Sequence, residues 1–302
     1  MTDQLNQEQK KTVESTNDQL LLIAGPGTGK TKTITHKIIH LIQARGISPT
    51  KILALTFTKK SATEMRERLS RLGLSIKKQP FVGTFHAFAH HLLSTYYTQE
   101  LEIIDQAKQL EIVHQIEQQL RLKVLFGVKT HEILRLISLQ KQAVRQKFPD
   151  WVEIFSAVYD QTLINQSLLD FDDLLIKAKE LLLNSSVKLN FQHILVDEFQ
   201  DTNQLQYHLL KLLVKPETKI TVVGDPLQSI YGFRGSSSEI FDTFRQDFSP
   251  LEIVLIDNYR NPGQIIKLSQ SLFPDSPVLK PKQKNFGKIT VVETLNEYTE
   301  AD

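Results

Sequence analysis

The chain has 302 residues, of which 40% are hydrophobic and 23% charged, and this balance excludes intrinsically disordered and fibrous proteins. The formal net charge of +2 provides no bulk attraction to nucleic acid, so any binding to DNA or RNA must come from local clusters of Lys and Arg. There is no cysteine, which excludes disulfides, thiolate metal sites and thiol redox chemistry.

The N-terminal segment 1–11 is polar and lacks the apolar core of a signal peptide. A membrane-spanning helix needs about 18 apolar residues in a row, and no later apolar run approaches that length. We therefore expect a cytoplasmic protein that has no membrane partner.

The first third of the chain alternates short apolar runs with segments of helical periodicity. We expect strands at 20–24, 52–56 and 81–83, a helix at 32–42 and another from about residue 60. Alternation of this kind predicts a parallel sheet with crossover helices.

The strand signal fades after residue 94, and the next segments have apolar residues at helical spacing. The expected helices are 109–120, 131–144, 151–165 and 171–183. Together they predict an all-helical insertion. The run from Asp170 to Asp173 places acidic side chains at the start of the last helix, where the helix dipole stabilises them, so we assign them no catalytic role.

The strand pattern resumes at 194–196, 220–223 and 251–255. Length alone allows either two domains or one large α/β unit that carries an insertion. After Pro262 we expect a helix to about residue 272, a linker at 274–284 that is rich in Pro and Lys, and a strand at 289–292. A second domain therefore begins in this last part.

A glycine-rich turn follows the first predicted strand and precedes a helix, which is the order that a phosphate site requires. Its residues are Ala24, Gly25, Pro26, Gly27, Thr28, Gly29, Lys30, Thr31 and Lys32. Glycines let successive backbone N–H groups point at phosphate oxygens, and the helix adds its positive N-terminal dipole. We expect Lys30 to reach the β- and γ-phosphates of ATP and the Thr31 hydroxyl to hold Mg²⁺. The strict pattern has Gly where this chain has Ala24.

The acidic pair Asp197-Glu198 follows the strand at 194–196. Asp197 would complete the Mg²⁺ shell through water, and Glu198 would orient and deprotonate the attacking water. Alone, such a pair could equally be two solvated carboxylates at a strand end. The phosphate-binding loop upstream favours the catalytic interpretation.

Several longer motifs follow one another along the chain. They are Leu5-Asn6-Gln7-Glu8-Gln9, Leu55-Thr56-Phe57-Thr58-Lys59-Lys60-Ser61-Ala62, Gly83-Thr84-Phe85-His86-Ala87-Phe88, Asp197-Glu198-Phe199-Gln200-Asp201-Thr202, Gly224-Asp225-Pro226-Leu227-Gln228 with the following residues to Gly235, and Asn258-Tyr259-Arg260. Together these motifs resemble those of the UvrD/Rep family of superfamily 1 DNA helicases, and they occur in the family's order. The family's own loop commonly begins Ala-Gly, which removes the difficulty of Ala24.

The resemblance implies the fold and the domains. It implies a P-loop NTPase (RecA-like) α/β motor domain with a parallel sheet, formed by residues 1–93 and 188–261, with the helical insertion at 94–187. Residues 262–302 would begin an incomplete second motor domain. The implied activity is ATP-dependent, Mg²⁺-dependent unwinding or translocation from 3′ to 5′ on single-stranded DNA.

The resemblance also implies roles for single residues. Gln9 would read the adenine edge and Tyr259 would stack on the base. Gln228 would sense the γ-phosphate and couple it to DNA, and Arg260 would contact the γ-phosphate. The chemistry supports such an arginine, because a guanidinium can bind two of the γ-phosphoryl oxygens that gain charge in the transition state. With Lys30 and Glu198, Gln228 and Arg260 form the expected catalytic set.

DNA contacts are expected on loops at the strand ends, because single-stranded DNA is held by aromatic faces under bases and by cations or hydroxyls on phosphates. The expected residues are Thr56, Phe57, Thr58, Thr84, His86, Tyr231, Phe233 and Arg234. Relatives often carry Trp where this chain has Phe233. The partner would be single-stranded DNA or a junction between duplex and single strand. A zinc site at His86, His90 and His91 is not expected, because no carboxylate or cysteine shares their spacing.

Family members need a second motor domain that closes the ATP site, and the first 302 residues do not supply its motifs. We therefore expect a fragment of a larger helicase, completed by a C-terminal remainder or by a protein partner. The alternative is a module that binds ATP and DNA without unwinding DNA by itself. A small-molecule kinase would share the phosphate-binding loop but has no reason to carry the other motifs.

Overall fold

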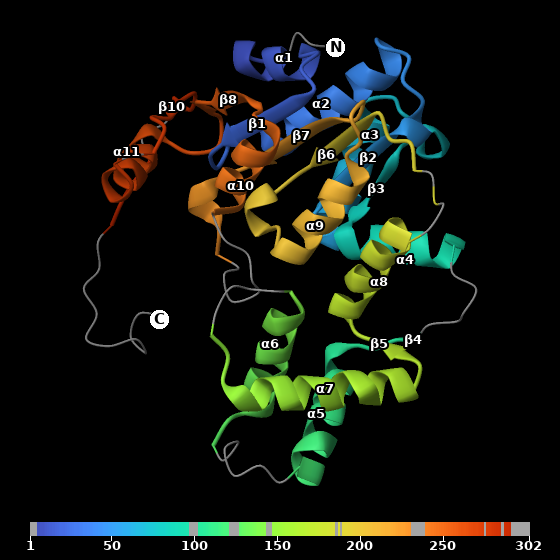
Figure 1. Ribbon diagram of the computed structural model, residues 1–302. Helices are drawn as coiled ribbons and strands as arrows, with labels where there is room; N and C mark the ends of the chain where they lie inside the picture. The colour runs from blue at the N-terminus through green and yellow to red at the C-terminus, as the bar shows by residue number, and fades with distance from the viewer. Residues whose placement is uncertain are drawn as a thin grey trace.

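A six-stranded, all-parallel sheet forms the centre of the computed structural model (Figure 1). The described residues are 5–96, 102–120, 127–142, 147–184, 187, 189–230, 239–274, 276–284 and 287–290. The strands lie in the order β3-β2-β6-β7-β1-β8. Their bounds are Gln19–Ala24 for β1, Ile52–Thr56 for β2, Phe81–Thr84 for β3, His193–Val196 for β6, Lys219–Gly224 for β7 and Leu251–Leu255 for β8. The sheet confirms the predicted α/β class.

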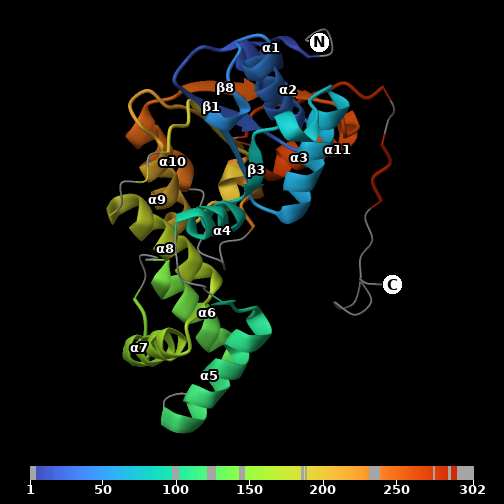
Figure 2. The same ribbon diagram turned by 90° about the vertical axis from the view of Figure 1, so that its right-hand side faces the viewer.

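Helices cover both faces of this sheet (Figures 1 and 2). In β1 the side chains alternate, with Leu21 and Ile23 in the core of one face and Leu20 and Leu22 in the core of the other. Strands buried on both sides read as continuous apolar runs, which is why the sequence pattern located them. The first face packs against α4 (Phe85–Tyr96), α8 (Phe171–Asn184), α9 (Gln204–Leu213) and α10 (Glu239–Phe248), and the second against α2 (Lys30–Gln43) and α3 (Lys59–Arg71).

The insertion forms a separate lobe below the sheet in both views (Figures 1 and 2). It consists of α5 (Gln106–Leu120), α6 (Thr130–Lys141) and α7 (Asp150–Asn165), with its own hydrophobic core around Phe155 and Tyr159. It also contains a short parallel ladder between β4 (Glu102–Ile103) and β5 (Leu168–Leu169). In contrast, α8 contributes Leu174 and Leu175 to the core of the sheet. The domain boundaries at 94 and 187 stay a prediction.

The C-terminal part differs in two places from the pattern expected from sequence. The predicted linker at 274–284 contains β10 (Lys280–Pro281), which pairs in parallel with β9 (Asp257–Asn258). The predicted strand at 289–292 is wrong at Ile289 and Thr290, which lie in no strand, and its last two residues lie outside the described residues. The expected helix is present as α11 (Gly263–Leu272). The N-terminal helix α1 (Gln7–Glu14) packs against α2 and β8.

None of the helices in the described part of the chain combines the length and the apolar character needed to cross a membrane. The described part of the chain also contains four 3₁₀ turns: η1 (Pro49–Lys51), η2 (Ile76–Lys78), η4 (Phe199–Asp201) and η5 (Pro226–Gln228).

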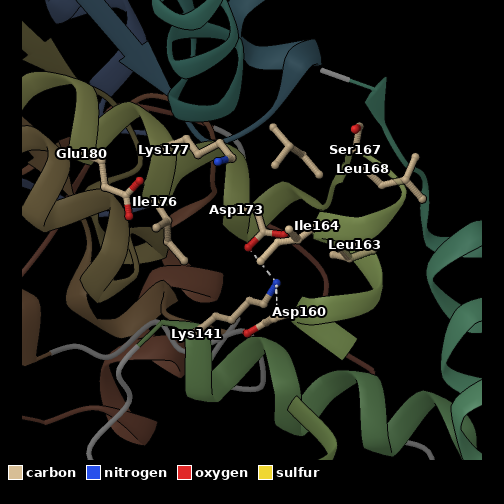
Figure 3. A pocket seen from close by; sticks show the side chains of 11 residues that line it. Lys141, Asp160, Leu163, Ile164, Ser167, Leu168, Asp173, Ile176, Lys177 and Glu180 are labelled. Atoms are coloured by element: carbon tan, nitrogen blue, oxygen red, sulfur yellow. Dashed lines mark hydrogen bonds and ion pairs between the residues drawn. The ribbon is translucent and has the colours of Figure 1, made fainter. Parts of the chain in front are cut away.

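A buried lysine joins the insertion lobe to α8. The Nζ atom of Lys141, whose side chain is 6% exposed, lies 2.9 Å from Asp160 Oδ1, 2.9 Å from Asp170 Oδ2 and 2.7 Å from Asp173 Oδ1. Figure 3 shows the Lys141 amino group joined by dashed lines to Asp160 and Asp173, in a cavity that both charged and apolar side chains line. Burial acts to lower the pKa of Lys141, but the charges of Asp170 and Asp173 outweigh burial and raise that pKa, so the lysine stays charged.

The acidic start of α8 therefore has a second structural role besides the expected one. Asp170 caps the helix, since its Oδ1 accepts a hydrogen bond of 2.8 Å from the backbone N–H of Asp173. Both carboxylates also bind Lys141 of α6. The charge pattern at the start of α8 gave no sign in the sequence of this contact with α6.

We predict that Lys141→Met lowers the free energy of unfolding by about 3–5 kcal/mol, because it leaves the buried Asp170 and the half-buried Asp173 without a counter-ion. Urea unfolding followed by the fluorescence of Trp151 measures this, since Trp151 is the chain's single tryptophan and lies in the core of the same lobe. The control is Lys108→Met, whose exposed pair with Glu111 at 3.0 Å is worth about 0–1 kcal/mol. Equal losses in the two variants would contradict the assigned role of Lys141.

Candidate active site

The described candidate residues, apart from Gln9 of α1, lie at one edge of the sheet because all six strands are parallel and their carboxyl ends point the same way (Figure 1). In open parallel sheets, ligands bind outside these carboxyl ends. The loops that leave this edge carry the P-loop after β1, Phe57 after β2, Thr84 and His86 at β3, Asp197-Glu198 after β6, Asp225 to Gln228 after β7, and Asn258 to Arg260 after β8.

The P-loop wraps around the side chain of its own lysine. Lys30 begins α2 and is 9% exposed, and its Nζ donates a hydrogen bond of 3.1 Å to the carbonyl of Ala24. The same Nζ lies 3.9 Å from Glu198 Oε2. The Thr28 hydroxyl donates to the carbonyl of Gly25 at 2.7 Å and holds the turn closed. The loop thus presents a buried cation beside an acidic side chain.

The segment after β8 docks onto the P-loop. The backbone N–H of Tyr259 donates to Gly27 O at 2.9 Å, and Asn258 Nδ2 donates to Pro26 O at 2.6 Å. Gly27 has φ +73°, and a Cβ atom there would lie 2.5 Å from the Cβ of Arg260. A glycine is therefore required for this approach. The contact brings Tyr259 and Arg260, both exposed, beside the loop, and their contacts with nucleotide stay predictions.

Gln9 supports the P-loop from α1. Its Nε2 donates to Thr28 O at 2.9 Å and its Oε1 accepts from the backbone N–H of Asn6 at 3.1 Å, so both ends of the buried amide are bonded. Asn6 Nδ2 in turn donates to Asp257 Oδ2 at 3.0 Å, which also accepts from the Tyr259 hydroxyl at 3.5 Å. Gln9 and Tyr259 thus lie in one cluster. Their roles toward adenine stay predictions.

The acidic pair lies against the first turn of α2. Asp197 is 2% exposed and accepts a hydrogen bond from the Thr31 side chain. Burial, followed by the nearby charge of Glu198, raises the pKa of Asp197 to about 7. Glu198 has left-handed backbone angles of φ 53° and ψ 49°, a conformation that costs a non-glycine residue of the order of 1–3 kcal/mol and is concentrated at functional sites.

The donor set fits Mg²⁺. Thr31 and Asp197 offer a hydroxyl and a carboxylate, which are the hard oxygen ligands that this ion prefers. The two carboxylates of the acidic pair face one lysine, so the pocket has surplus negative charge that a divalent cation would neutralise. Among the described residues no group of three or more His, Asp or Glu is arranged to hold a metal. A metal at Thr31 and Asp197 would therefore need further ligands from phosphate and water.

Gln228 lies at the end of η5, in the loop that follows β7, the strand next to β6. Its Nε2 donates to Asp225 Oδ2 at 2.6 Å, and Asp225 Oδ1 accepts from the backbone N–H of Leu227 at 3.1 Å. Gln200, to which the sequence patterns assigned no role, lies between this loop and the acidic pair. Gln200 donates from Nε2 to Glu198 Oε2 at 2.8 Å and accepts at Oε1 from the backbone N–H of Asp225 at 3.1 Å. The place of Gln200 in the sequence did not predict these two hydrogen bonds.

The expected DNA contacts at β2 and β3 lie side by side. Thr56 and Thr84 are Cα partners in the parallel pairing, and both are buried. The Thr84 hydroxyl accepts from the backbone N–H of Ala87 at 3.1 Å, and that of Thr58 accepts from Ser61 N at 3.0 Å, so both hydroxyls cap helices. Their contact with DNA stays a prediction.

The aromatic candidates are only partly described. Phe57, which follows β2, is half-buried. Lys32, which belongs to the predicted nucleotide site and not to this group, is half-buried in the first turn of α2. The His86 ring packs edge-on against Phe171 with centroids 5.5 Å apart. Burial lowers the pKa of His86 to about 4, so this ring is neutral at pH 7 and could contact DNA only by hydrogen bonding or stacking. Tyr231, Phe233 and Arg234 lie outside the described residues.

Comparisons with known proteins agree with this geometry. Residues 5–249 match the family described as UvrD/REP helicase N-terminal domain. DNA helicase II of Escherichia coli (strain K12) is 33% identical over 296 residues, which cover 91% of this chain and 41% of that protein. ATP-dependent DNA helicase Rep of Buchnera aphidicola subsp. Acyrthosiphon pisum is 34% identical over 293 residues, with 90% and 45% covered. ATP-dependent DNA helicase PcrA of Staphylococcus aureus (strain NCTC 8325 / PS 47) is 30% identical over 329 residues, with 100% and 45% covered. The chain spans less than half the length of these relatives.

We predict that Gly27→Ala raises the dissociation constant for a fluorescent ATP analogue by at least about tenfold, or about 1.4 kcal/mol. The new Cβ would collide with Arg260 and Asn258 and displace the loop. The control is Gly73→Ala. Gly73 also has a positive φ, of +90°, but has open space around it. Its replacement costs about 1–2 kcal/mol of backbone strain and leaves nucleotide affinity unchanged. An equal loss of affinity in both variants would show that general strain, not the contact with Arg260, is responsible.

Proposed function

The chain belongs to the UvrD/REP helicase family, and from this membership we propose that it is the ATP-binding, N-terminal part of an ATP-dependent DNA helicase. One observation carries the proposal. Lys30 of the P-loop and the Asp197-Glu198 pair, which are 167 positions apart in sequence, meet at the carboxyl ends of β1 and β6 with Lys30 Nζ 3.9 Å from Glu198 Oε2. A phosphate-binding cation beside a carboxylate pair is the arrangement that ATP hydrolysis requires.

Nucleotide binding would use the groups at the P-loop. The backbone N–H groups of the loop and the start of α2 would hold the phosphates, and Lys30 would exchange the carbonyl of Ala24 for the β- and γ-phosphate oxygens. Thr31 directly, and Asp197 through water, would hold Mg²⁺, which when bound supplies positive charge to the phosphate oxygens. Gln9 and Tyr259 would contact the base from the cluster beside the loop.

Hydrolysis would then proceed with water as the nucleophile. The water oxygen bonds to the γ-phosphorus while the bond from phosphorus to the β–γ bridging oxygen breaks, and Glu198 takes the proton of the water. Arg260 would bind the γ-phosphoryl oxygens as their charge rises. Gln228, from the loop after β7, would respond to the presence of the γ-phosphate.

The DNA substrate would lie over the carboxyl ends of β2 and β3, beside the nucleotide. The support is the position of Thr56, Phe57 and Thr84 and the names of the relatives, which are DNA helicases. The proposed substrate is single-stranded DNA or its junction with duplex, and movement from 3′ to 5′ is supported by the family resemblance alone. A second motor domain would come from the rest of the protein or from a partner. A cytoplasmic location remains a prediction.

A second candidate is a module that binds ATP and DNA without unwinding DNA by itself. It is favoured by one observation, that the 302 residues correspond to 41–45% of the length of the relatives. Stepping along DNA requires two domains that open and close with each ATP, so a single motor domain can bind nucleotide and yet lack the cycle.

We predict that the chain hydrolyses ATP in the presence of Mg²⁺ and that single-stranded DNA stimulates this turnover. Lys30→Ala and Glu198→Gln should each lower kcat by about 100-fold or more, because they remove a phosphate-binding charge and the general base. A phosphate-release assay with and without an oligothymidylate measures both effects. The controls are Lys129→Ala and Glu217→Gln, which change exposed residues far from the site.

The outcomes separate the two candidates. Turnover that is insensitive to Lys30→Ala and Glu198→Gln would refute the site assignment. Nucleotide binding without DNA-stimulated turnover would favour the binding module over the hydrolysing motor.

A further inference from the structure

We propose that Gln200 is a positioning residue for ATP hydrolysis, which holds the Glu198 carboxylate and ties it to the loop that carries Gln228. Nothing in the sequence motifs or the comparisons assigns this glutamine a role. The inference rests on the proposed function, because it concerns the general base of the proposed reaction. It is carried by two hydrogen bonds of one buried side chain.

The first bond fixes the base. Gln200 is 3% exposed, and its Nε2 donates to Glu198 Oε2 at 2.8 Å. Lys30 approaches the same oxygen, but only to 3.9 Å, and it is already bonded to the carbonyl of Ala24. When Lys30 binds a phosphate instead, the Gln200 side chain would still donate its hydrogen bond to Glu198 Oε2. A carboxylate held in this way keeps its position for proton transfer.

The second bond reaches the next strand loop. Gln200 Oε1 accepts from the backbone N–H of Asp225 at 3.1 Å, and Asp225 Oδ2 accepts from Gln228 Nε2 at 2.6 Å. The Ser229 hydroxyl also donates to the carbonyl of Gln200 at 3.3 Å. A continuous path of hydrogen bonds therefore runs from the base Glu198 through Gln200 and Asp225 to Gln228.

The direction of the Gln200 amide is determined by its partners. A backbone N–H can only donate and an ionised carboxylate can only accept, so Oε1 must face Asp225 and Nε2 must face Glu198. The backbone of β7 leaves room for this arrangement, since a Cβ atom on Gly224 would lie 2.6 Å from Gln200 Oε1. Both polar ends of the buried amide are satisfied, as expected for a residue with a defined orientation.

The backbone conformation at Glu198 explains why its carboxylate needs a hydrogen-bond partner that fixes its position. Glu198 is in a left-handed conformation, and the following Phe199 is fully buried, with ring centroids 5.4 Å from both Phe241 and Phe244. Phe199 anchors the turn in the core, but its apolar ring cannot donate a hydrogen bond to the carboxylate. Gln200 adds the missing contact at the side-chain end. A shift of Gln228 would thus reach the base through two residues.

The test compares two variants of nearly the same shape in the 302-residue chain. Gln200→Glu keeps an acceptor for the Asp225 N–H but replaces the donor to Glu198 by a second carboxylate. We expect kcat for ATP to fall about 10- to 100-fold while the dissociation constant of a fluorescent ATP analogue changes by less than about threefold. The matched control is Gln206→Glu. Gln206 is also buried, and its Oε1 accepts from Asn203 N in a helix capping box, a role that Glu can keep. This control should retain wild-type turnover.

A double-mutant cycle separates positioning from a general structural effect. In the Glu198→Gln background, measured by single-turnover hydrolysis, Gln200→Glu should lower the rate no further, because the base through which Gln200 acts is absent. A loss that multiplies with that of Glu198→Gln would refute the positioning role, as would a wild-type kcat for Gln200→Glu. If the unmodified chain shows no turnover that depends on Lys30, the proposed function itself fails and this inference fails with it.

Discussion

The parallel direction of all six central strands is the constraint on which the candidate site depends. Parallel pairing requires each strand to be followed by a crossover on one face of the sheet, so every carboxyl end emerges at the same edge. β1 pairs with β7 and β8, and β2 with β3 and β6, which leaves no antiparallel neighbour in this sheet. If one central strand ran the other way, its loop would leave at the opposite edge and its functional residues would lie far from the P-loop.

The strand order, in addition to the direction, arranges the roles. β1 and β8 bring the P-loop and Arg260 together on one side, while β2 and β3 place the DNA candidates on the other. β6 and β7 lie between them and carry Glu198 and Gln228. The residue proposed to cleave ATP and the residue proposed to sense it therefore occupy the middle of the edge, where a short hydrogen-bond path through Gln200 can join them. In the proposed function, coupling between nucleotide and DNA would then need only side-chain shifts at neighbouring strand ends.

The central strands and the P-loop could be predicted from the sequence, whereas several contacts between distant segments could not, and both outcomes have physical reasons. Strands buried on both faces give apolar runs, and the glycines of the P-loop mark a turn that other residues cannot form, so β2 and the loop were predicted with their bounds. Contacts between distant segments have no such local signature. The pairing of β10 with β9 in the expected linker, the bond from Gln200 to Asp225 and the ion pairs of Lys141 with Asp170 and Asp173 all join segments more than 20 residues apart.

The network around Lys30 shows how binding of phosphate and release of the base are linked. Without nucleotide, Lys30 donates to one neutral carbonyl and approaches Glu198, so its charge is only partly compensated. A hydrogen bond in which one partner is charged contributes about 1.5–3 kcal/mol, roughly twice as much as a bond between two neutral groups. Phosphate therefore displaces the carbonyl with a net gain smaller than the full strength of the new bond. The same displacement would take the lysine away from Glu198. In the proposed reaction, the hydrogen bond from Gln200 would then keep the Glu198 carboxylate in place.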